Sequence, residues 1–286
     1  ISLVLWAMPS NPLIHVFAFL LLSLGCLGFY DDVQKVLHKN ADHGLSSRMK
    51  LLGQLVIGAL AIYWLDSVPE TKGVIRDFMV PFYKDAVWHG MPLVVAMIFG
   101  VVVIVGSSNA VNLTDGMDGL ATGCTIIVSL AYAFLAYVCG HRIFAEYLQV
   151  PFIPGASEVV VLATAMAGGC LGFLWHNCPP AAMYMGDTGS LPLGGAVALM
   201  ATLVKQELLL IVIGGVFVME AMSVIIQTRY FKFSRWRTGT PVRIFKCAPI
   251  HHHFKMVGWK ETQVVVRFWI IGVLCAALGL ATLKIR

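Results

Sequence analysis

The stretch from Asn109 to Leu120, NAVNLTDGMDGL, gathers side chains that could bind a substrate or a cation between two long apolar runs. It contains two aspartates, two asparagines, a threonine and two glycines. Such apolar runs are membrane-spanning candidates, so the stretch is predicted at a membrane surface, where acidic groups are functional or well solvated. Helix capping could explain the acids, with Thr114 or Asp115 as the cap and Asp118 in the first turn of the next helix. Capping does not explain the two asparagines, which favours a functional loop.

A second acidic group ends another apolar run, in the sequence Gly28-Phe-Tyr-Asp31-Asp32. If the helix continues past this point, Asp31 and Lys35 share one face at i,i+4, while Asp32 is turned away by about 100°. The two carboxylates can therefore have different tasks. One could contact a cation or a nucleophile while the other orients a neighbouring group. Ordinary Asp–Lys pairs at a helix end that enters water are the structural alternative.

A third acidic position lies in the sequence Gly186-Asp-Thr-Gly-Ser190, where a tight turn precedes a helix whose N-terminal amides could approach a phosphate. One aspartate in a turn is usually a capping residue, so this motif gains weight only from the other acids at the same surface. Converging carboxylates repel each other unless a cation lies among them, and all-oxygen ligands suit Mg²⁺ or Mn²⁺. The acids expected to converge are Asp31, Asp32, Asp115, Asp118 and Asp187.

Two further features carry ionisable side chains. Consecutive histidines, His251 to His253, cannot all reach one tetrahedral ion from a regular helix or strand, and no cysteine or carboxylate pattern completes a zinc site. Hydrogen bonding to phosphate, or proton handling, is favoured for them. Glu220 lies within an apolar run and is a functional candidate for that reason. The alternative is that Glu220 and Gln227, on the same helix face, bond a neighbouring helix.

Composition indicates the elements that must position these side chains. The 286 residues are 58% hydrophobic and 12% charged, which excludes an ordinary soluble domain and predicts an integral membrane protein. Neither an internal repeat nor a domain boundary is evident, so residues 1–286 are predicted to form a single all-α membrane domain. Seven scattered cysteines are predicted to be free thiols. Spanning helices are expected at 13–30, 48–65, 92–108, 118–138, 158–175, 189–204, 207–228 and 264–283.

The positive charges predict which loops face the cytoplasm. Loop parity puts 31–47, 109–117, 176–188 and 229–263 on one side, which with its edges holds twelve lysines and arginines. The opposite loops hold five, and two more lie at the C-terminal end. By the positive-inside rule the first side is cytoplasmic. The acidic groups and the histidines all belong to that side.

Four of these segments resemble the motifs of one enzyme family. GFYDD with the lysines after it, SSNAVNLTDGMDGLA, MGDTGS and PIHHHFKMVGWKETQVVVRFWII are similar, in the same order, to the phospho-N-acetylmuramoyl-pentapeptide transferases, or translocase I. This family belongs to the polyprenyl-phosphate N-acetylhexosamine-1-phosphate transferase superfamily. The resemblance covers essentially the whole chain. It implies a polytopic helical bundle in the bacterial cytoplasmic (inner) membrane, with an active-site cleft on the cytoplasmic face and a role in peptidoglycan biosynthesis.

The resemblance also implies the reaction and its residues. UDP-MurNAc-pentapeptide and undecaprenyl phosphate would give lipid I and UMP, with Mg²⁺ bound at Asp187. Catalytic roles are implied for Asp31, Asp32, Lys35, Lys39, Asp187, His251, His252 and His253. Substrate contacts are implied for Asn109, Asn112, Asp115, Asp118, Asn177, Tyr184, Gly186, Ser190 and Gln227. Within that set the Tyr184 ring is suited to stacking on uracil, and Gln227 lies near the nucleoside.

Two mechanisms fit this assignment. In the first, an oxygen of the lipid phosphate attacks the β-phosphate of the UDP-sugar directly, and Asp31 accepts a proton from the lipid phosphate or orients it. Lys35, Lys39 and the histidines would then stabilise the added charge, and Mg²⁺ at Asp187 would neutralise the diphosphate. In the second, an aspartate first forms a covalent phosphosugar intermediate.

The chain departs from the family pattern in two places. Family members have ten spans, whereas about eight spans and a fragment are expected here, because residues 1–8 resemble the tail of an earlier span and no initiator Met is present. The N-terminal part of the family fold is therefore expected to be missing. Lys255 follows the histidines where family members commonly carry an acid, so a role for that acid cannot be transferred.

Other functions stay open at this point. A relative that transfers N-acetylglucosamine-1-phosphate from UDP-GlcNAc to undecaprenyl phosphate is the nearest competitor, although the PIHHHF run favours the muramoyl-pentapeptide enzyme. A membrane transporter would also combine helices with acidic groups, but it predicts them near the bilayer midplane. The basic loops fit phosphates and anionic membrane lipid headgroups, and nothing indicates nucleic-acid binding. A homodimer is compatible with the resemblance.

Overall fold

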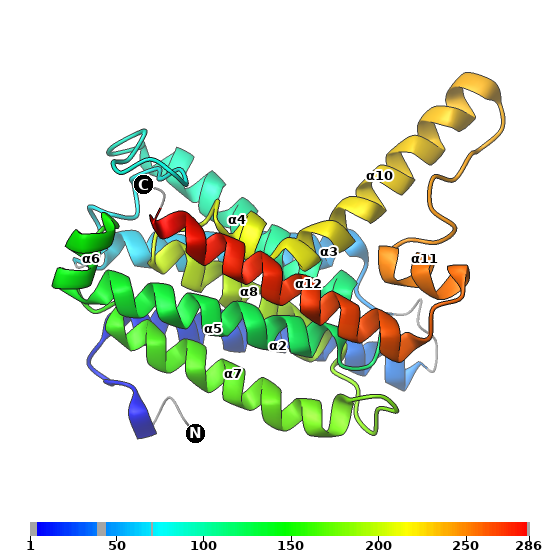
Figure 1. Ribbon diagram of the computed structural model, residues 1–286, viewed down its shortest axis with the longest axis horizontal. Coiled ribbons are helices and arrows are strands. Elements are labelled where there is room, and N and C mark those ends of the chain that lie inside the picture. Colours follow the sequence, from blue (N-terminus) through cyan, green and yellow to red (C-terminus); the bar gives the residue numbers. More distant parts are fainter. Residues whose placement is uncertain (1–4, 39–43, 70, 285–286) are drawn as a thin grey trace.

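The computed structural model describes residues 5–38, 44–69 and 71–284, and it is a bundle of helices (Figure 1). Within these ranges the chain forms helices and one isolated antiparallel bridge, between Phe78 and Trp88. The predicted all-α class is confirmed. The helices in chain order are α2 (Pro12–Leu37), α3 (Ser47–Ser67), α4 (Leu93–Thr114), α5 (Leu120–Gly140), α6 (Arg142–Leu148), α7 (Ser157–Asn177), α8 (Gly186–Leu203), α9 (Leu210–Ile213), α10 (Gly215–Thr238), α11 (Ile250–Val257), α12 (Glu261–Ala281) and the 3₁₀ helix η2 (Thr282–Lys284).

Six of the described helices are long and apolar enough to cross a membrane. They are α2, α3, α4, α5, α7 and the segment Glu261–Lys284. The other two expected spans, 189–204 and 207–228, differ from the prediction. The first corresponds to α8, which begins with the polar sequence Gly186–Ser190 and is enclosed by its neighbours. The second is divided at Gly214 between α9 and α10.

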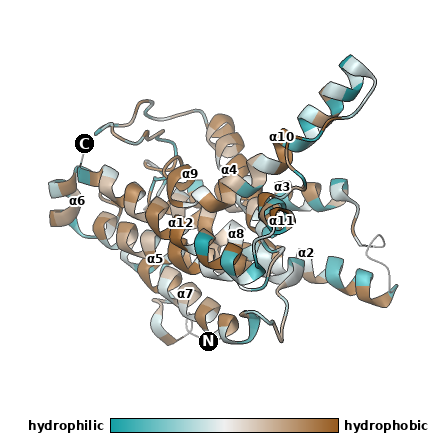
Figure 2. Ribbon diagram, turned by 45° about the vertical axis from the view of Figure 1, so that its right-hand side comes forward, coloured by the Kyte–Doolittle hydropathy of each residue, from teal (hydrophilic) through white to brown (hydrophobic). Residues whose placement is uncertain are grey.

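Helix α10 leaves the bundle and projects away from it, and the chain then returns through α11 (Figure 1). Its outer end is hydrophilic (Figure 2), with exposed Arg229, Lys232, Arg235 and Arg237. The segment 229–263, expected to be a loop, therefore contains the end of α10 and all of α11.

Helix α2 continues well past its apolar run, as the sequence predicted. The side chain of Asn11 caps its first turn by accepting from the Leu13 amide at 2.9 Å, and Pro12 occupies the first helical position, where no amide proton is needed. The helix then runs through Asp31 and Lys35 to Leu37. Both acids of the Asp31-Asp32 pair therefore lie on a rigid helix.

Helix α8 lies at the centre of the bundle, packed against α2 and α4. From Ser190 to Leu203 almost every residue is buried. Close approach depends on small residues, because a Cβ at Gly28 of α2 would overlap the carbonyl group of Asp187 and the amide nitrogen of Thr188. This contact joins the acidic end of α2 directly to the first turn of α8.

We expect Gly28→Ala to destabilise the protein by about 1–3 kcal/mol, because backbone atoms of α8 cannot yield to the added methyl group without moving the helix. Gly25→Ala is the matched control, since a Cβ there would lie 3.9 Å from the nearest atom, the carbonyl oxygen of Thr188. Thermal unfolding in detergent measures both variants. Equal melting temperatures for the two would contradict the packing described for α2 and α8.

The stretch 109–120 is more helical than predicted. Helix α4 continues to Thr114, whose hydroxyl donates to the carbonyl of Ala110 at 2.8 Å. Helix α5 begins after Gly119, which has a φ of +74° and provides no side-chain cap. The prediction that Thr114 or Asp115 caps α5 and that Asp118 lies in its first turn is therefore wrong, because Gly119 occupies the capping position and α5 begins at Leu120.

Candidate active site

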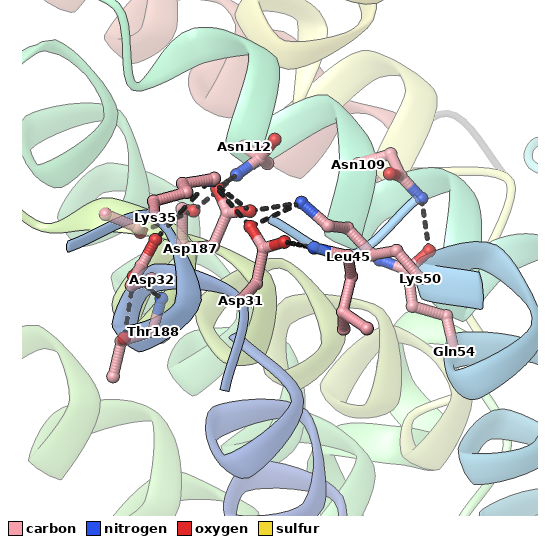
Figure 3. A network of polar contacts seen from close by, with 12 residues as sticks. Asp31, Asp32, Lys35, Leu45, Lys50, Gln54, Asn109, Asn112, Asp187 and Thr188 are labelled. Carbon is pink, nitrogen blue, oxygen red and sulfur yellow. Dashed lines mark hydrogen bonds and ion pairs between the residues drawn. The ribbon is translucent and has the colours of Figure 1, made fainter. Parts of the chain in front are cut away.

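Three carboxylates converge where α2 meets the first turn of α8. Asp31, Asp32 and Asp187 each offer an oxygen, and these oxygens lie within 4.8 Å of one another (Figure 3). Asp31 is fully buried, whereas Asp32 and Asp187 are partly exposed. A set of carboxylate oxygens at this spacing suits a hard divalent cation. These three residues, called here the acidic cluster, could hold a metal ion.

Two lysines lie among the carboxylates of the acidic cluster. Lys35 Nζ is 2.6 Å from Asp31 Oδ2, 3.6 Å from Asp32 Oδ1 and 3.4 Å from Asp187 Oδ2. Lys50 Nζ is 2.9 Å from Asp31 Oδ2 and also contacts Asp187 Oδ2. These ammonium groups offset much of the repulsion between three carboxylates.

The adjacent acids Asp31 and Asp32 have different contacts. Asp31 Oδ1 accepts from the amide of Leu45 at 2.6 Å, and its Oδ2 contacts both lysines. Asp32 Oδ2 accepts from the amide and the hydroxyl of Thr188, at 2.9 and 2.7 Å. Asp32 therefore satisfies an amide in the first turn of α8. The sequence predicted that amides at the N-terminus of this helix could approach a phosphate. The Thr188 amide instead donates to Asp32 within the protein.

The two asparagines of α4 lie on different sides of the site. Asn112 Nδ2 donates to Asp187 Oδ1 at 2.6 Å and to the Ser190 hydroxyl at 2.8 Å, so both side chains belong to the surroundings of the acidic cluster. Asn109 Nδ2 donates instead to Gln54 Oε1 of α3 at 2.8 Å. Asn109 thus bridges two helices, beside Lys50 (Figure 3).

A second group of the expected site residues surrounds a neighbouring pocket of about 250 Å³. Asn177 is buried and accepts from the Thr122 hydroxyl at 2.9 Å, and Asp118 accepts from the Ala181 amide at 2.9 Å. These contacts join α5, α7 and the segment after α7. Tyr184 is 78% exposed, so its ring is free to stack on a ligand. The pocket is lined by Asp115, Gly116, Met117, Asp118, Asn177, Tyr184, Met185 and Gly186.

The Asp115 carboxyl has a raised pKa. Burial, and next the negative charges of Asp187 and Asp32, raise the pKa of the Asp115 carboxyl to about 7. Asp115 therefore changes its charge in the neutral range, beside a pocket and near the acidic cluster. A cation bound nearby would favour its ionised form.

We expect Asp115→Asn to stabilise the protein increasingly as pH rises. A carboxyl whose pKa is raised in the folded state loses stability between its unfolded pKa, about 4, and its folded pKa, about 7. An asparagine does not ionise and so loses no stability over this range. The melting-temperature advantage of the variant should therefore grow between these pH values and level off above pH 7. Melting temperatures from pH 4 to pH 8.5 in the absence of divalent cations measure it. An advantage that is constant with pH would contradict the raised pKa.

The histidines and Gln227 lie apart from the acidic cluster, with no hydrogen bond or ion pair to it among the described residues. His251 Nδ1 lies 3.0 Å from Glu220 Oε2. His253 Nδ1 accepts from the amide of Lys246 at 3.1 Å, and Gln227 Oε1 accepts from the amide of Phe245 at 3.0 Å. These contacts organise the segment between α10 and α11.

Burial, followed by the nearby His251 and Lys255, lowers the pKa of His252. The neutral imidazole is therefore favoured for His252, and it could accept a hydrogen bond or a proton. Lys39 lies outside the described residues, so its expected catalytic position stays a prediction.

Sequence reasoning missed the role of Lys50. This lysine was counted only as a cytoplasmic charge, although it contacts two members of the acidic cluster. Its position depends on the start of α3, where the Ser46 hydroxyl accepts from the Met49 amide at 3.3 Å. Thr188 and Gln54 were also missed, since each contacts its partner from a distant part of the chain.

Comparison with known proteins gives the family. Residues 14–205 match the model described as glycosyl transferase family 4. A protein of Methylacidiphilum infernorum named phospho-N-acetylmuramoyl-pentapeptide-transferase is 44% identical over 100% of this chain and 76% of its own length. The chain belongs to this transferase family. Proteins of the same name from Neisseria meningitidis (serogroup C, strain FAM18) and Pelagibacter ubique are 46% and 45% identical, again over 100% of this chain and over 77% and 76% of their own lengths.

Membership in the phospho-N-acetylmuramoyl-pentapeptide transferase family confirms the resemblance found in the sequence and identifies the chain as an enzyme. The six candidate spans agree with a multi-pass membrane protein. The match to the family model ends at residue 205, whereas the full-length relatives extend the similarity through α10, α11 and α12.

Proposed function

We propose that this protein transfers phospho-N-acetylmuramoyl-pentapeptide from UDP-MurNAc-pentapeptide to undecaprenyl phosphate, giving lipid I and UMP. The observation that carries the proposal is full-length identity of about 45% to relatives that bear this enzyme name. An oxygen of the lipid phosphate would form a bond to the β-phosphorus of the nucleotide, and the bond from that phosphorus to the UMP oxygen would break. Peptidoglycan biosynthesis is the process that consumes such a product.

The position of the acidic cluster supports a lipid phosphate as the acceptor. Asp31 lies near the end of the candidate span α2, and Lys50 lies near the beginning of the candidate span α3. The ends of spanning helices coincide with the headgroup level of a bilayer, which is where a phosphate on a membrane-embedded prenyl chain would lie. A buried carboxylate and two ammonium groups at this level could receive it.

The residues of the site divide the work as follows. The buried Asp31 would orient the lipid phosphate or accept its proton, and Lys35 and Lys50 would stabilise the negative charge added during transfer. Asn112 holds the Asp187 carboxylate through its hydrogen bond, and Asp32 holds the first turn of α8 through Thr188. Tyr184 would stack on the uracil beside the pocket that contains Asp115 and Asp118.

Magnesium is the metal we propose for the acidic cluster, with Asp187 as a ligand and Asp31 and Asp32 within reach. Bound there, Mg²⁺ would neutralise the diphosphate of the substrate. The contacts of Lys35 and Lys50 with these carboxylates support a preference of the acidic cluster for positive charge. The site would lie on the cytoplasmic face of the bacterial inner membrane, which the basic end of α10 supports by the positive-inside rule.

UMP release tests the proposed function. The purified protein in detergent with undecaprenyl phosphate and Mg²⁺ is given UDP-MurNAc-pentapeptide in one reaction and UDP-GlcNAc in the other. We expect UMP and a pyrophosphate-linked lipid from the first sugar nucleotide only. UMP from UDP-GlcNAc alone would identify the competing GlcNAc-1-phosphate transferase. Flux of a substrate into liposomes without UMP formation would instead support a transporter.

A further inference from the structure

Glu220 and His251 form a buried pair outside the acidic cluster. Glu220 lies on α10 and His251 in the first turn of α11, and neither side chain is exposed. Their atoms Oε2 and Nδ1 are 3.0 Å apart. Within the described chain, none of the carboxylate oxygens or ring nitrogens of this pair makes an aligned hydrogen bond, so the 3.0 Å contact between Glu220 and His251 is an electrostatic one. A buried carboxylate is costly unless it is paired, so the imidazole is the group that compensates Glu220.

The edge of the His251 ring that carries Nε2 faces the turn between α4 and α5. A Cβ at Gly116 would overlap Nε2 and Cε1 of His251, so the ring lies directly against the turn that follows α4. The same turn lines the 250 Å³ pocket with Asp115, Gly116 and Asp118. His251 therefore connects a carboxylate inside the bundle with the wall of the proposed nucleotide pocket.

Other ionisable groups lie near Glu220 and His251. Lys255 is paired with Glu261 at 2.7 Å. The His252 ring centroid lies 4.1 Å from that of His251. Among the described residues, His251 is the basic side chain that lies within 4.0 Å of the Glu220 carboxylate. The titratable groups that interact with the pair are His252 on α11, which is near both members, and Cys124 on α5, which is near Glu220. Lys255 and Glu261 lie near His252, and Cys275 lies near Cys124.

We propose that Glu220 is a positioning residue for His251 in the phosphosugar transfer. Its carboxylate, with Oε2 3.0 Å from Nδ1 of His251, favours the proton on Nδ1 and leaves Nε2 directed at the turn. The neutral ring then offers an acceptor at Nε2, and the protonated ring offers a donor to negative charge that develops on the substrate. The inference rests on the proposed function, since the charge it stabilises is that of the transferred phosphoryl group.

A double-mutant cycle tests the coupling. We expect Glu220→Gln to lower kcat for UMP release by about 10- to 100-fold with little change in KM for UDP-MurNAc-pentapeptide, a loss typical of a group that orients a functional histidine. His251→Gln should lower kcat at least as much. The double variant should be no slower than His251→Gln, because Glu220 acts through that ring. Losses that multiply in the double variant, or Glu220→Gln activity equal to the unsubstituted protein, would overturn the proposal.

Two further variants separate positioning from support of the fold. Ser223→Ala is the matched control, because Ser223 is buried on the same helix and donates to the Glu220 backbone carbonyl at 2.7 Å without contacting His251. It should keep its kcat. Glu220→Asp restores a carboxylate and should recover part of the activity lost in Glu220→Gln. A loss in Ser223→Ala as large as that in Glu220→Gln would assign Glu220 a purely structural role.

Nitrogen-15 NMR of ring-labelled histidine gives a readout without turnover. In the unsubstituted protein we expect the His251 ring, assigned with His251→Gln, to carry its proton on Nδ1, and we expect this signal to change in Glu220→Gln. A His251 signal that is the same in both proteins would overturn the positioning role, including when the variant fails in the enzyme assay. If the unsubstituted protein releases no UMP from either sugar nucleotide, the proposed function fails, while the NMR result still decides the pairing.

Discussion

Replacing Asp187 by asparagine is expected to lower kcat for Mg²⁺-dependent UMP release on the order of 10³-fold, because the amide removes a charged ligand and an ion-pair partner from the acidic cluster at once. The Asp187 carboxylate contacts Lys35, Lys50 and Asn112. Asparagine has nearly the same shape, so the protein should remain folded. Steady-state UMP release as a function of Mg²⁺ concentration measures the loss.

Asp85→Asn is the control for Asp187→Asn. Asp85 is an exposed carboxylate in the connection after α3, and α3 begins near the acidic cluster and leads away from it. The control should keep the activity and Mg²⁺ dependence of the unsubstituted protein. An Asp187→Asn protein with full Mg²⁺-dependent activity would contradict the metal assignment.

Replacing Lys50 by methionine is expected to have two opposite effects. It should lower kcat by about 10²- to 10³-fold, because an ammonium group that stabilises the transferred phosphate is lost. It should also lower the Mg²⁺ concentration needed for half-maximal activity, because Lys50 Nζ competes for oxygens of Asp31 and Asp187. Mg²⁺ titrations of UMP release report both quantities from one experiment.

Arg48→Met is the matched control, since Arg48 is exposed and lies two residues before Lys50 on the same helix. It should change neither quantity by more than about twofold, as surface charges contribute little. If Lys50→Met needed more Mg²⁺ and kept its kcat, Lys50 would have a structural role instead of the one proposed.

The helical class and the shared helix face of Asp31 and Lys35 could be predicted because they depend on local patterns. Long apolar runs must form helices in lipid, since backbone groups there need internal partners. The i,i+4 relation of Asp31 and Lys35 follows from helix geometry alone and is confirmed at 2.6 Å. The family motifs added the expected site residues, whose roles stay proposals.

Other features depend on contacts between distant segments and could not be predicted. Lys50 joins the acidic cluster only because α3 begins beside Asp31, which a pattern in the sequence does not express. The pairing of Glu220 with His251 likewise requires the chain to leave the bundle along α10 and return through α11. Glu220 contacts His251 of the neighbouring helix α11, which agrees with the contact between helices that the sequence left as an alternative, and its functional role stays a proposal.

Local sequence patterns gave wrong predictions where a glycine or packing determines where a helix begins or breaks. Asp118 has the spacing of an acid in a first helical turn, yet α5 begins after Gly119, and Asp118 accepts a hydrogen bond from the Ala181 amide instead. The span expected at 207–228 is apolar enough in sequence, but it is divided at Gly214. Hydropathy averages over such breaks and so does not locate them.

Single-turnover UMP release in the absence of lipid phosphate tests the central claim most directly. The claim is that the acidic cluster and its lysines promote direct attack of the lipid phosphate on the β-phosphate of the nucleotide. With an excess of protein over labelled UDP-MurNAc-pentapeptide and with Mg²⁺, we predict no UMP until undecaprenyl phosphate is added, and then UMP equal to the lipid product. Stoichiometric UMP with label attached to the protein, before any lipid is added, would contradict direct attack and establish a covalent intermediate.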